Sequence, residues 1–379
     1  MNKQSLRSSS SMTRTAGLKE LEYWVATSAI PGVGTATFNY LLKHFKTLRK
    51  FWDVGDEQIR KLKVDAKTRE SIIEFRQKVD PKVYLDTVYE RGIKVVSVVD
   101  RDYPANLRQI SDAPAVLYYK GNLLPADDLA MAVVGSRYPT VYGKQVTEKL
   151  VTELVVSGLA IVSGLARGID SIAHRAALDA GGRTIAVLGS GVDLIYPPEN
   201  KKLADEVVKN GALVSEFPLG FPSVPSNFPA RNRIISGLSL GVLVTEAAVD
   251  SGSLITAGQA AEQGREVFAV PGPITSKMSE GANNLIKEGV HPTTNASDIL
   301  QILDIERKKM QVETRDQKLE TRNIAKEERK VLDLLDGQAK HIDVIVRESG
   351  LAIDKLSATL SIMELRGLVK NFGSGMWGV

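Results

Sequence analysis

Short apolar runs alternate with helical patterns from residue 131 to about residue 303, and this alternation constrains the fold more than any other feature of the sequence. Each run is rich in Val, Ile, Leu and Ala, and a turn with Gly or Pro and then a helical pattern follow it. The runs lie at 131–134, 159–162, 184–188, 212–214, 242–244 and 267–270. Continuously apolar strands are expected to be covered on both faces, and strands separated by helices form right-handed βαβ units. The sequence therefore predicts an α/β fold with a doubly wound, mostly parallel sheet.

Helical patterns precede this segment. Apolar residues at helical spacing from 18 to 75 predict an all-helical N-terminal domain. Between its first two helices, residues 30–34 (Ile-Pro-Gly-Val-Gly) predict a tight turn that its glycines permit. The turn resembles the helix-hairpin-helix element of DNA-binding proteins, although a plain helical hairpin explains it equally, because the turn contains no Lys or Arg. A helix at 81–91 and strands at 93–99 and 115–119 are predicted next.

The C-terminal part carries a second pattern. Residues 306–322 are charged, mixed in sign and poor in large apolar side chains, which indicates a linker. Helical patterns at 327–335, 342–348 and 354–365 and two short strands at 368–370 and 376–379 predict a winged helix. Its third helix offers only Lys355 as a base before Arg366, which favours a protein contact or weak DNA binding over sequence-specific reading. The predicted domains are a disordered tail (1–16), a SAM/helix-hairpin-helix-like helical domain (17–78), an α/β domain (79–304), a linker (305–322) and a winged-helix domain (323–379).

Composition excludes several classes of function. The 49 Lys and Arg against 45 Asp and Glu give a net charge of only +4, so any nucleic-acid binding requires a local basic patch. The chain has no cysteine and only four widely separated histidines, so we expect no disulfide, no metal site and no cofactor bound through thiolates. No apolar window approaches the length of a membrane span, and residues 1–15 lack the apolar stretch of a secretory signal. We therefore expect a cytoplasmic protein.

Turns rich in Gly, Ser and Arg follow the predicted strands at 135–137, 163–170, 189–193, 227–233 and 250–253. Parallel strands bring their carboxyl ends to one edge of a sheet, and α/β sheets bind ligands at that edge. Glycines allow close backbone approach, helix N-termini offer free N–H groups, and arginines add fixed positive charge. The edge is therefore predicted to form a crevice for anions that includes Arg137, Arg167, Arg231 and Arg233.

These residues also have other possible roles. A single arginine could cap a helix or pair with Asp170, Asp193 or Glu246, but four at one sheet edge favour a binding site. A dinucleotide fingerprint is absent because Leu194 stands where GxGxxG needs its third glycine, and no Walker A loop is present. Ser171 and His174 share a helical face, yet no acid partner or oxyanion site accompanies them, so a catalytic triad is not predicted.

The same turns resemble the DNA-processing protein A family (DprA, also called Smf). The resemblance rests on long ungapped strings: GSR (135–137), SGLARGID (163–170), AVLGSGVD (186–193), FPARNRIISGLS (228–239), SGSLITA (251–257) and EQGREVFAVPG (262–272). It covers about residues 104–303. It implies an extended Rossmann-like fold and a homodimer that binds single-stranded DNA without sequence preference. It also implies that the protein protects incoming or exposed single strands and helps to load the RecA recombinase in natural transformation and recombination, with no catalytic step.

The residues support that chemistry, because single strands need cations along the backbone and surfaces for bases. Phe228 lies among the arginines, where it could stack a base or belong to the core. Lys201, at the start of a helix, is a weaker candidate. The predicted DNA-binding residues are Gly135, Ser136, Arg137, Gly164, Arg167, Gly168, Lys201, Phe228, Arg231, Asn232, Arg233, Ser251, Gly252 and Ser253.

The main alternative is an enzyme on the same scaffold, either a nucleotide-binding protein or an N-glycosyl hydrolase. It would use Glu246 as its acid/base and Arg231 or Arg233 to hold a phosphate. Related Rossmann families of that kind carry a PGGxGT string near the site, which the Gly-rich strings at 250–253 and 270–273 do not fit. A third possibility is an interaction module whose ends recruit other proteins.

Overall fold

The structure is a computed structural model that describes residues 20–305, 308, 326–335, 339–365, 368–373 and 375–378. The chain forms two compact units, Met1–Lys308 and Lys309–Val379, and each is described by itself. The predicted tail (1–16) and most of the predicted linker (305–322) lie outside the described residues.

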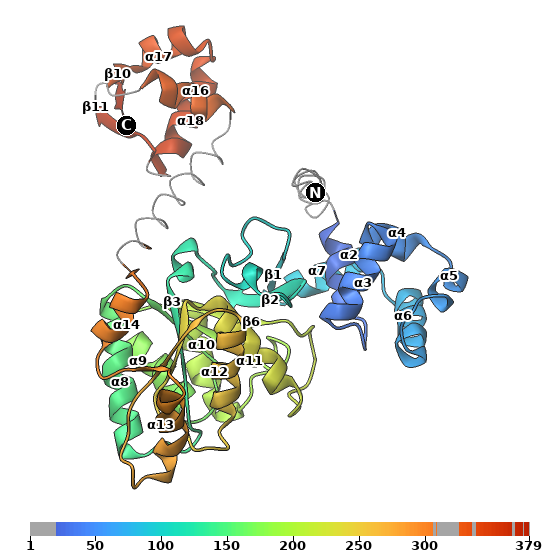
Figure 1. Cartoon of the computed structure of the whole chain (residues 1–379). Coiled ribbons are helices and arrows are strands. Elements are labelled where there is room, and N and C mark those ends of the chain that lie inside the picture. The colour runs from blue at the N-terminus through green and yellow to red at the C-terminus, as the bar shows by residue number, and fades with distance from the viewer. Residues whose placement is uncertain are drawn as a thin grey trace, which may run out of the picture. The chain divides into compact units, whose positions relative to one another are not determined.

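The first unit begins with short helices, shown in blue in Figure 1: α2 (Leu21–Ser28), α3 (Thr35–Phe45), α4 (Leu48–Asp53), α5 (Asp56–Arg60), α6 (Ala66–Lys78) and α7 (Pro81–Glu90). The predicted turn at 30–34 joins α2 to α3, and Gly32 adopts a φ of 85°, which favours glycine. Side-chain oxygens of Thr47, Asp65 and Asp80 accept hydrogen bonds from the first turns of α4, α6 and α7. These caps set where the helices begin.

The N-terminal helices share one core with the first two strands, β1 (Lys94–Ser97) and β2 (Val116–Gly121). Trp24, Phe38 and Phe51 are buried in the same cluster as Val116 and Tyr118. The Tyr118 hydroxyl lies 2.8 Å from Ser28 Oγ and donates to the Val25 carbonyl at 3.2 Å. The predicted boundary at 78/79 is therefore not a break in packing, because the core continues across it.

Among the described residues, nine strands form one sheet in the order β1-β2-β6-β5-β4-β3-β7-β8-β9. The remaining strands are β3 (Ala130–Val134), β4 (Ala160–Ser163), β5 (Thr184–Val187), β6 (Gly211–Ser215), β7 (Gly241–Val244), β8 (Glu266–Ala269) and β9 (His291–Pro292). All pairs from β6 to β9 are parallel, whereas β2 is antiparallel to both β6 and β1. The doubly wound, mostly parallel prediction is confirmed. The chain reverses its winding between β3 and β7, which makes their junction the switch point of the sheet.

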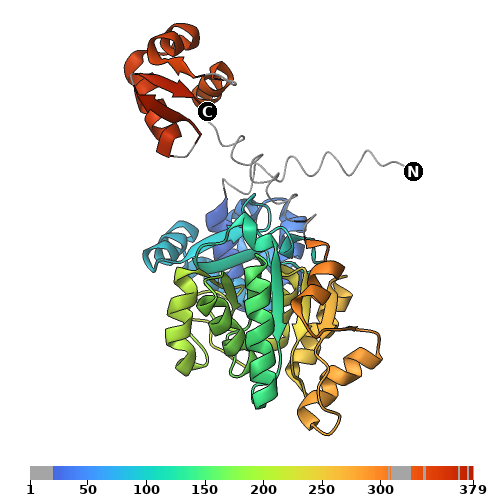
Figure 2. The ribbon, with the colours of Figure 1, turned by 90° about the vertical axis from the view of Figure 1, so that its left-hand side faces the viewer.

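Alternate residues of each strand face opposite helical layers. Ala132, Val134 and Val162 pack against the layer of α11 (Asn227–Leu238), α12 (Gly252–Glu262) and α13 (Glu280–Lys287). Met131 and Val133 pack against α8 (Val141–Val156), α9 (Ile169–Asp179) and α14 (Ala296–Ile302), and α10 (Lys201–Lys209) continues this layer over β5 and β6. Figure 2 faces this second layer. Both faces are covered, as the continuous apolar runs predicted.

The second unit contains α16 (Lys326–Leu334), β10 (Lys340–His341), α17 (Ile342–Ser349), α18 (Ile353–Leu365), β11 (Lys370–Gly373) and β12 (Met376–Gly378). Its three strands pair antiparallel in the order β10-β12-β11. Trp377 of β12 is buried with Val331, Ile345 and Leu360. The predicted winged helix is confirmed, with a short strand before α17 that the sequence did not reveal. Lys355 of α18 pairs with Glu327 at 3.0 Å, and Arg366 lies outside the described residues.

Candidate nucleic-acid interface

A cavity of 570 Å³ opens at the switch point of the sheet. Two segments form much of its wall: residues 134–138, at the end of β3 and just after it, and residues 248 and 250–253, between β7 and the start of α12. The start of α11 supplies the third wall with Phe228, Pro229 and Asn232. Because β3 to β7 all run parallel, the turns after them meet at one edge, as predicted. The structure thus gathers nine predicted residues around one cavity: Gly135, Ser136, Arg137, Phe228, Arg231, Asn232, Ser251, Gly252 and Ser253.

The N-terminus of α12 presents polar groups to this cavity. Ser251 is the N-cap, its Oγ accepts a hydrogen bond from Ser253 N, and the two Oγ atoms lie 2.7 Å apart. The free N–H groups of a helix start attract negative charge. In the segment after β3, Ser136 is buried and its Oγ accepts a hydrogen bond from Tyr138 N at 3.0 Å. The part of the cavity next to the N-terminus of α12 is therefore suited to an anion.

Two guanidinium groups lie near the aromatic ring of Phe228. The Arg137 guanidinium carbon is 5.4 Å from the ring centroid and that of Arg231 is 5.7 Å from it. Phe228 is half-buried, so it is neither a pure core residue nor a free platform. Arg137 is exposed and has no ion-pair partner among the residues that the structure describes. Its charge is therefore available to a ligand.

Arg231 is held inside the protein. It is only 4% exposed, and its Nη1 donates to the Val187 carbonyl at 2.6 Å. Burial lowers the pKa of Arg231 to about 10, and the nearby Asp170 carboxylate opposes that shift. The guanidinium therefore stays protonated at neutral pH next to the Phe228 ring. A Cβ at Gly164 would lie 1.9 Å from Arg231 Nη1, so this glycine makes room for the arginine.

Gly168 has a similar internal role. Its φ of 76° favours glycine, and a Cβ there would lie 2.3 Å from the Ser136 carbonyl. Ile169 N donates to that same carbonyl at 3.0 Å, which ties the turn after β4 to the turn after β3. Gly164 and Gly168 lie outside the cavity wall. At these two positions neighbouring protein atoms occupy the space of a side chain, and contact with a ligand stays a prediction.

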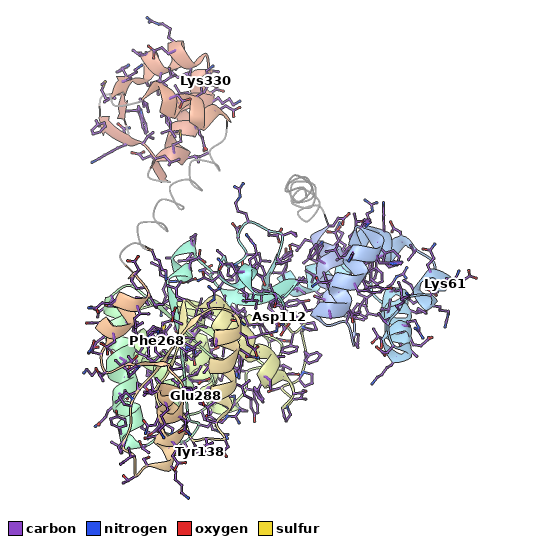
Figure 3. All side chains as sticks on the ribbon, viewed as in Figure 1. Lys61, Asp112, Tyr138, Phe268, Glu288 and Lys330 are labelled. Atoms are coloured by element: carbon purple, nitrogen blue, oxygen red, sulfur yellow. The ribbon has the colours of Figure 1, made fainter. Side chains whose placement is uncertain are left out.

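Three predicted cations do not line the cavity. Arg167 is exposed and donates from Nε to Glu199 Oε1. Lys201 pairs with Asp205 at 2.9 Å, one turn along α10. Arg233 is 9% exposed and bridges Glu216 at 2.5 Å and Asp112, which Figure 3 labels, at 3.2 Å. Arg233 faces away from the cavity because it lies two residues beyond Arg231 on α11, which places the two side chains on different faces of the helix.

Glu246, the acid/base residue of the enzymatic alternative, is hydrogen-bonded to Thr140. Glu246 is 2% exposed, and its carboxylate accepts hydrogen bonds from Thr140 N at 2.8 Å and Thr140 Oγ1 at 2.5 Å. It does not line the cavity. Burial lowers the pKa of His174 to about 3, while Ser171 Oγ donates to the Ala166 carbonyl rather than to His174. Of the residues considered for catalysis, Glu246, Ser171 and His174 do not line the cavity.

Sequence reasoning missed several residues of the site. Tyr138, labelled in Figure 3 at the lower end of the unit, lines the cavity with 76% of its surface exposed. Asp170 and Met278 also line the cavity. Tyr138 could have been found, because an aromatic residue directly after the Gly135-Ser136-Arg137 turn must lie at the same sheet edge. Met278 gives no such signal, because its segment reaches the cavity only through the packing of α13.

Comparison with known families identifies the chain. The sequence model of DNA recombination-mediator protein A matches residues 94–304, which is more than half of the chain. The chain belongs to this family. The DprA winged helix domain matches residues 315–372 as well. The resemblance to the DprA/Smf family that the turns indicated is thereby confirmed.

Individual relatives of the DprA/Smf family agree. The chain is 40% identical to Protein Smf of Synechocystis over 75% of its own length and 73% of the relative's. The crystal structure of DprA from Streptococcus pneumoniae matches with a TM-score of 0.64 and 37% identity, covering 74% of this chain and 95% of that one. DprA from Helicobacter pylori, whose structure concerns its single-stranded DNA binding mode, matches with a TM-score of 0.51 and 31% identity, covering 56% and 96%. Within the described residues, no helix is long and apolar enough to cross a membrane.

Proposed function

We propose that the chain binds single-stranded DNA without sequence preference, in the cavity at the switch point. The observation that carries this proposal is the exposed Arg137 guanidinium over the Phe228 ring, at the mouth of a cavity walled by a helix N-terminus. A cation for the backbone beside a ring for a base is the combination that single strands require. The Helicobacter pylori relative, whose structure concerns the binding of single-stranded DNA, supports the same ligand.

The decisive experiment compares single-stranded and duplex oligonucleotides of equal length by fluorescence anisotropy over a range of salt concentrations. We expect tighter binding to the single strand, because the cavity can admit a nucleobase that is not in a duplex. The helix α18 carries only one basic residue, Lys355, and this lysine already forms an ion pair with Glu327. Affinity should fall with salt, with a slope of about −0.7 per phosphate neutralised. Equal affinity for both forms, or binding that is independent of salt, contradicts the proposal.

The family suggests the wider role. We propose that the protein is a cytoplasmic homodimer, without enzymatic activity, that protects single strands and helps RecA to load on them during transformation and recombination. Glu246 is buried against Thr140 and does not line the cavity, which supports a binding protein over an N-glycosyl hydrolase. Incubation with nucleoside monophosphates, with free base as the readout, tests this point. Release of free base would favour the enzyme.

A further inference from the structure

Arg167 projects from a loop whose backbone is held from several directions. The backbone N–H groups of Gly164 and Ala166 donate to Asp170 Oδ2 at 3.0 and 3.3 Å. The Leu165 carbonyl accepts a hydrogen bond from Asn200 Nδ2 at 2.8 Å. The backbone that carries Arg167 is therefore held in place at the carboxyl end of β4.

Glu199, the ion-pair partner of Arg167, is positioned by the hydrogen bond from Asn200 to the loop. Glu199 belongs to the short helix η3 (Pro198–Asn200), directly before the asparagine that holds the loop. Arg167 Nε donates to Glu199 Oε1, and the two side chains are 53% and 49% exposed. This pairing raises the pKa of Arg167 and lowers the pKa of Glu199, so both are charged at neutral pH. An exposed ion pair adds little to stability, and the loop is held without it.

An aromatic ring belongs to the same segment as Glu199, because Tyr196 lies three residues before it. The Tyr196 ring is 49% exposed, and its centroid lies 6.1 Å from that of Phe228. Arg137, Phe228 and Tyr196 therefore lie next to one another, and Tyr196 is three residues before Glu199, the partner of Arg167. These side chains form a strip with two rings between two cations. Cations and aromatic rings side by side suit a surface for phosphates and bases.

We infer that the DNA strand leaves the cavity along this strip, and that Glu199 occupies, in the free protein, the place that a DNA phosphate takes on Arg167 in the complex. Carboxylates and phosphates bind guanidinium groups in similar geometry, so one replaces the other readily. Binding of the strand then requires the Arg167–Glu199 pair to open, and Glu199 lowers the affinity for DNA. The inference rests on the proposed function and adds a phosphate subsite outside the cavity.

The test is Glu199→Gln, which keeps the shape of the side chain and removes its charge. The matched control is Glu206→Gln, because Glu206 is also a partly exposed glutamate paired with an arginine, Arg175, at 2.5 Å, but Arg175 is not part of the strip. Both variants change the net charge equally. We expect Glu199→Gln to bind oligo-dT two- to fivefold more tightly than Glu206→Gln, with a salt slope steeper by about 0.7, because one more phosphate then meets an unneutralised arginine.

A double-variant cycle completes the experiment. In an Arg167→Ala background, the effect of Glu199→Gln should fall to that of the control, because no guanidinium remains for the two anions to share. Equal affinities of Glu199→Gln and Glu206→Gln, or a gain that persists without Arg167, would overturn the inference. Arg137→Ala is measured beside them: if it weakens binding while Glu199→Gln matches the control, the proposed function stands and only the subsite fails. If the unmodified protein does not bind single strands, both proposals fall.

Discussion

Arg137 and Arg231 contact the same aromatic ring, yet their surroundings predict different consequences for their loss. Arg137→Ala removes an exposed cation, so binding should weaken for oligo-dT and oligo-dA alike, the salt slope should drop by about one, and the melting temperature should not change. Arg231→Ala removes a charged hydrogen bond to a buried carbonyl, which should cost about 2 kcal/mol of unfolding free energy. Anisotropy titrations and circular-dichroism melts separate the two effects. A lower melting temperature for Arg137→Ala would make its role structural.

Arg233 yields a prediction about pH. Burial raises the pKa of Glu216, and the Arg233 guanidinium opposes that shift. Arg233→Ala leaves a largely buried carboxylate without its cation, which should cost about 3 kcal/mol near neutral pH. Without the guanidinium, the pKa of Glu216 in the folded protein lies further above its value in the unfolded chain. The loss of unfolding free energy therefore comes from the ionised carboxylate and grows as the pH rises. Urea unfolding should therefore show a smaller deficit at pH 4 than at pH 8. A variant of normal stability that fails to bind DNA would instead return Arg233 to the strand-binding surface.

At the scale of elements, the order of strands, helices and turns could be predicted because each depends on local pattern. The alternating apolar runs are sufficient to predict that the turns with Arg137 and Ser251 lie at one edge of the sheet. The pairing of side chains could not be predicted in this way. Arg233 meets Glu216 and Asp112 only after β6, α11 and the loop before β2 have packed together. The need for glycine at Gly164 likewise depends on Arg231, which lies far along the chain.

The helices at the start of the chain behave as part of the sheet unit. Their core includes Val116 and Tyr118 of β2, and α7 continues it beyond residue 78. Deletion of residues 1–78 should therefore expose an apolar face of β1 and β2 and lower the melting temperature strongly or cause aggregation. Circular-dichroism melts and size-exclusion chromatography of the deleted chain measure this. A soluble chain with an unchanged cooperative melt would show that residues 17–78 form an independent domain, as the sequence pattern predicted.

At the scale of the whole molecule, the winged helix has its own core, so the sheet unit should bind single strands without it. The truncation should follow Lys308 rather than Leu303. Ile305 is 3% exposed in the same cluster as Leu303 and Phe268, so truncation after Leu303 would remove a core side chain, whereas truncation after Lys308 keeps the compact unit whole. The sheet unit should melt at the same temperature in chain 1–308 as in the full chain. The affinity of chain 1–308 for oligo-dT should lie within a few-fold of that of the full chain. Fluorescence anisotropy measures the affinity, with chain 1–303 as the comparison that should be less stable. A loss beyond tenfold, about 1.4 kcal/mol, in chain 1–308 would place the winged helix within the DNA site.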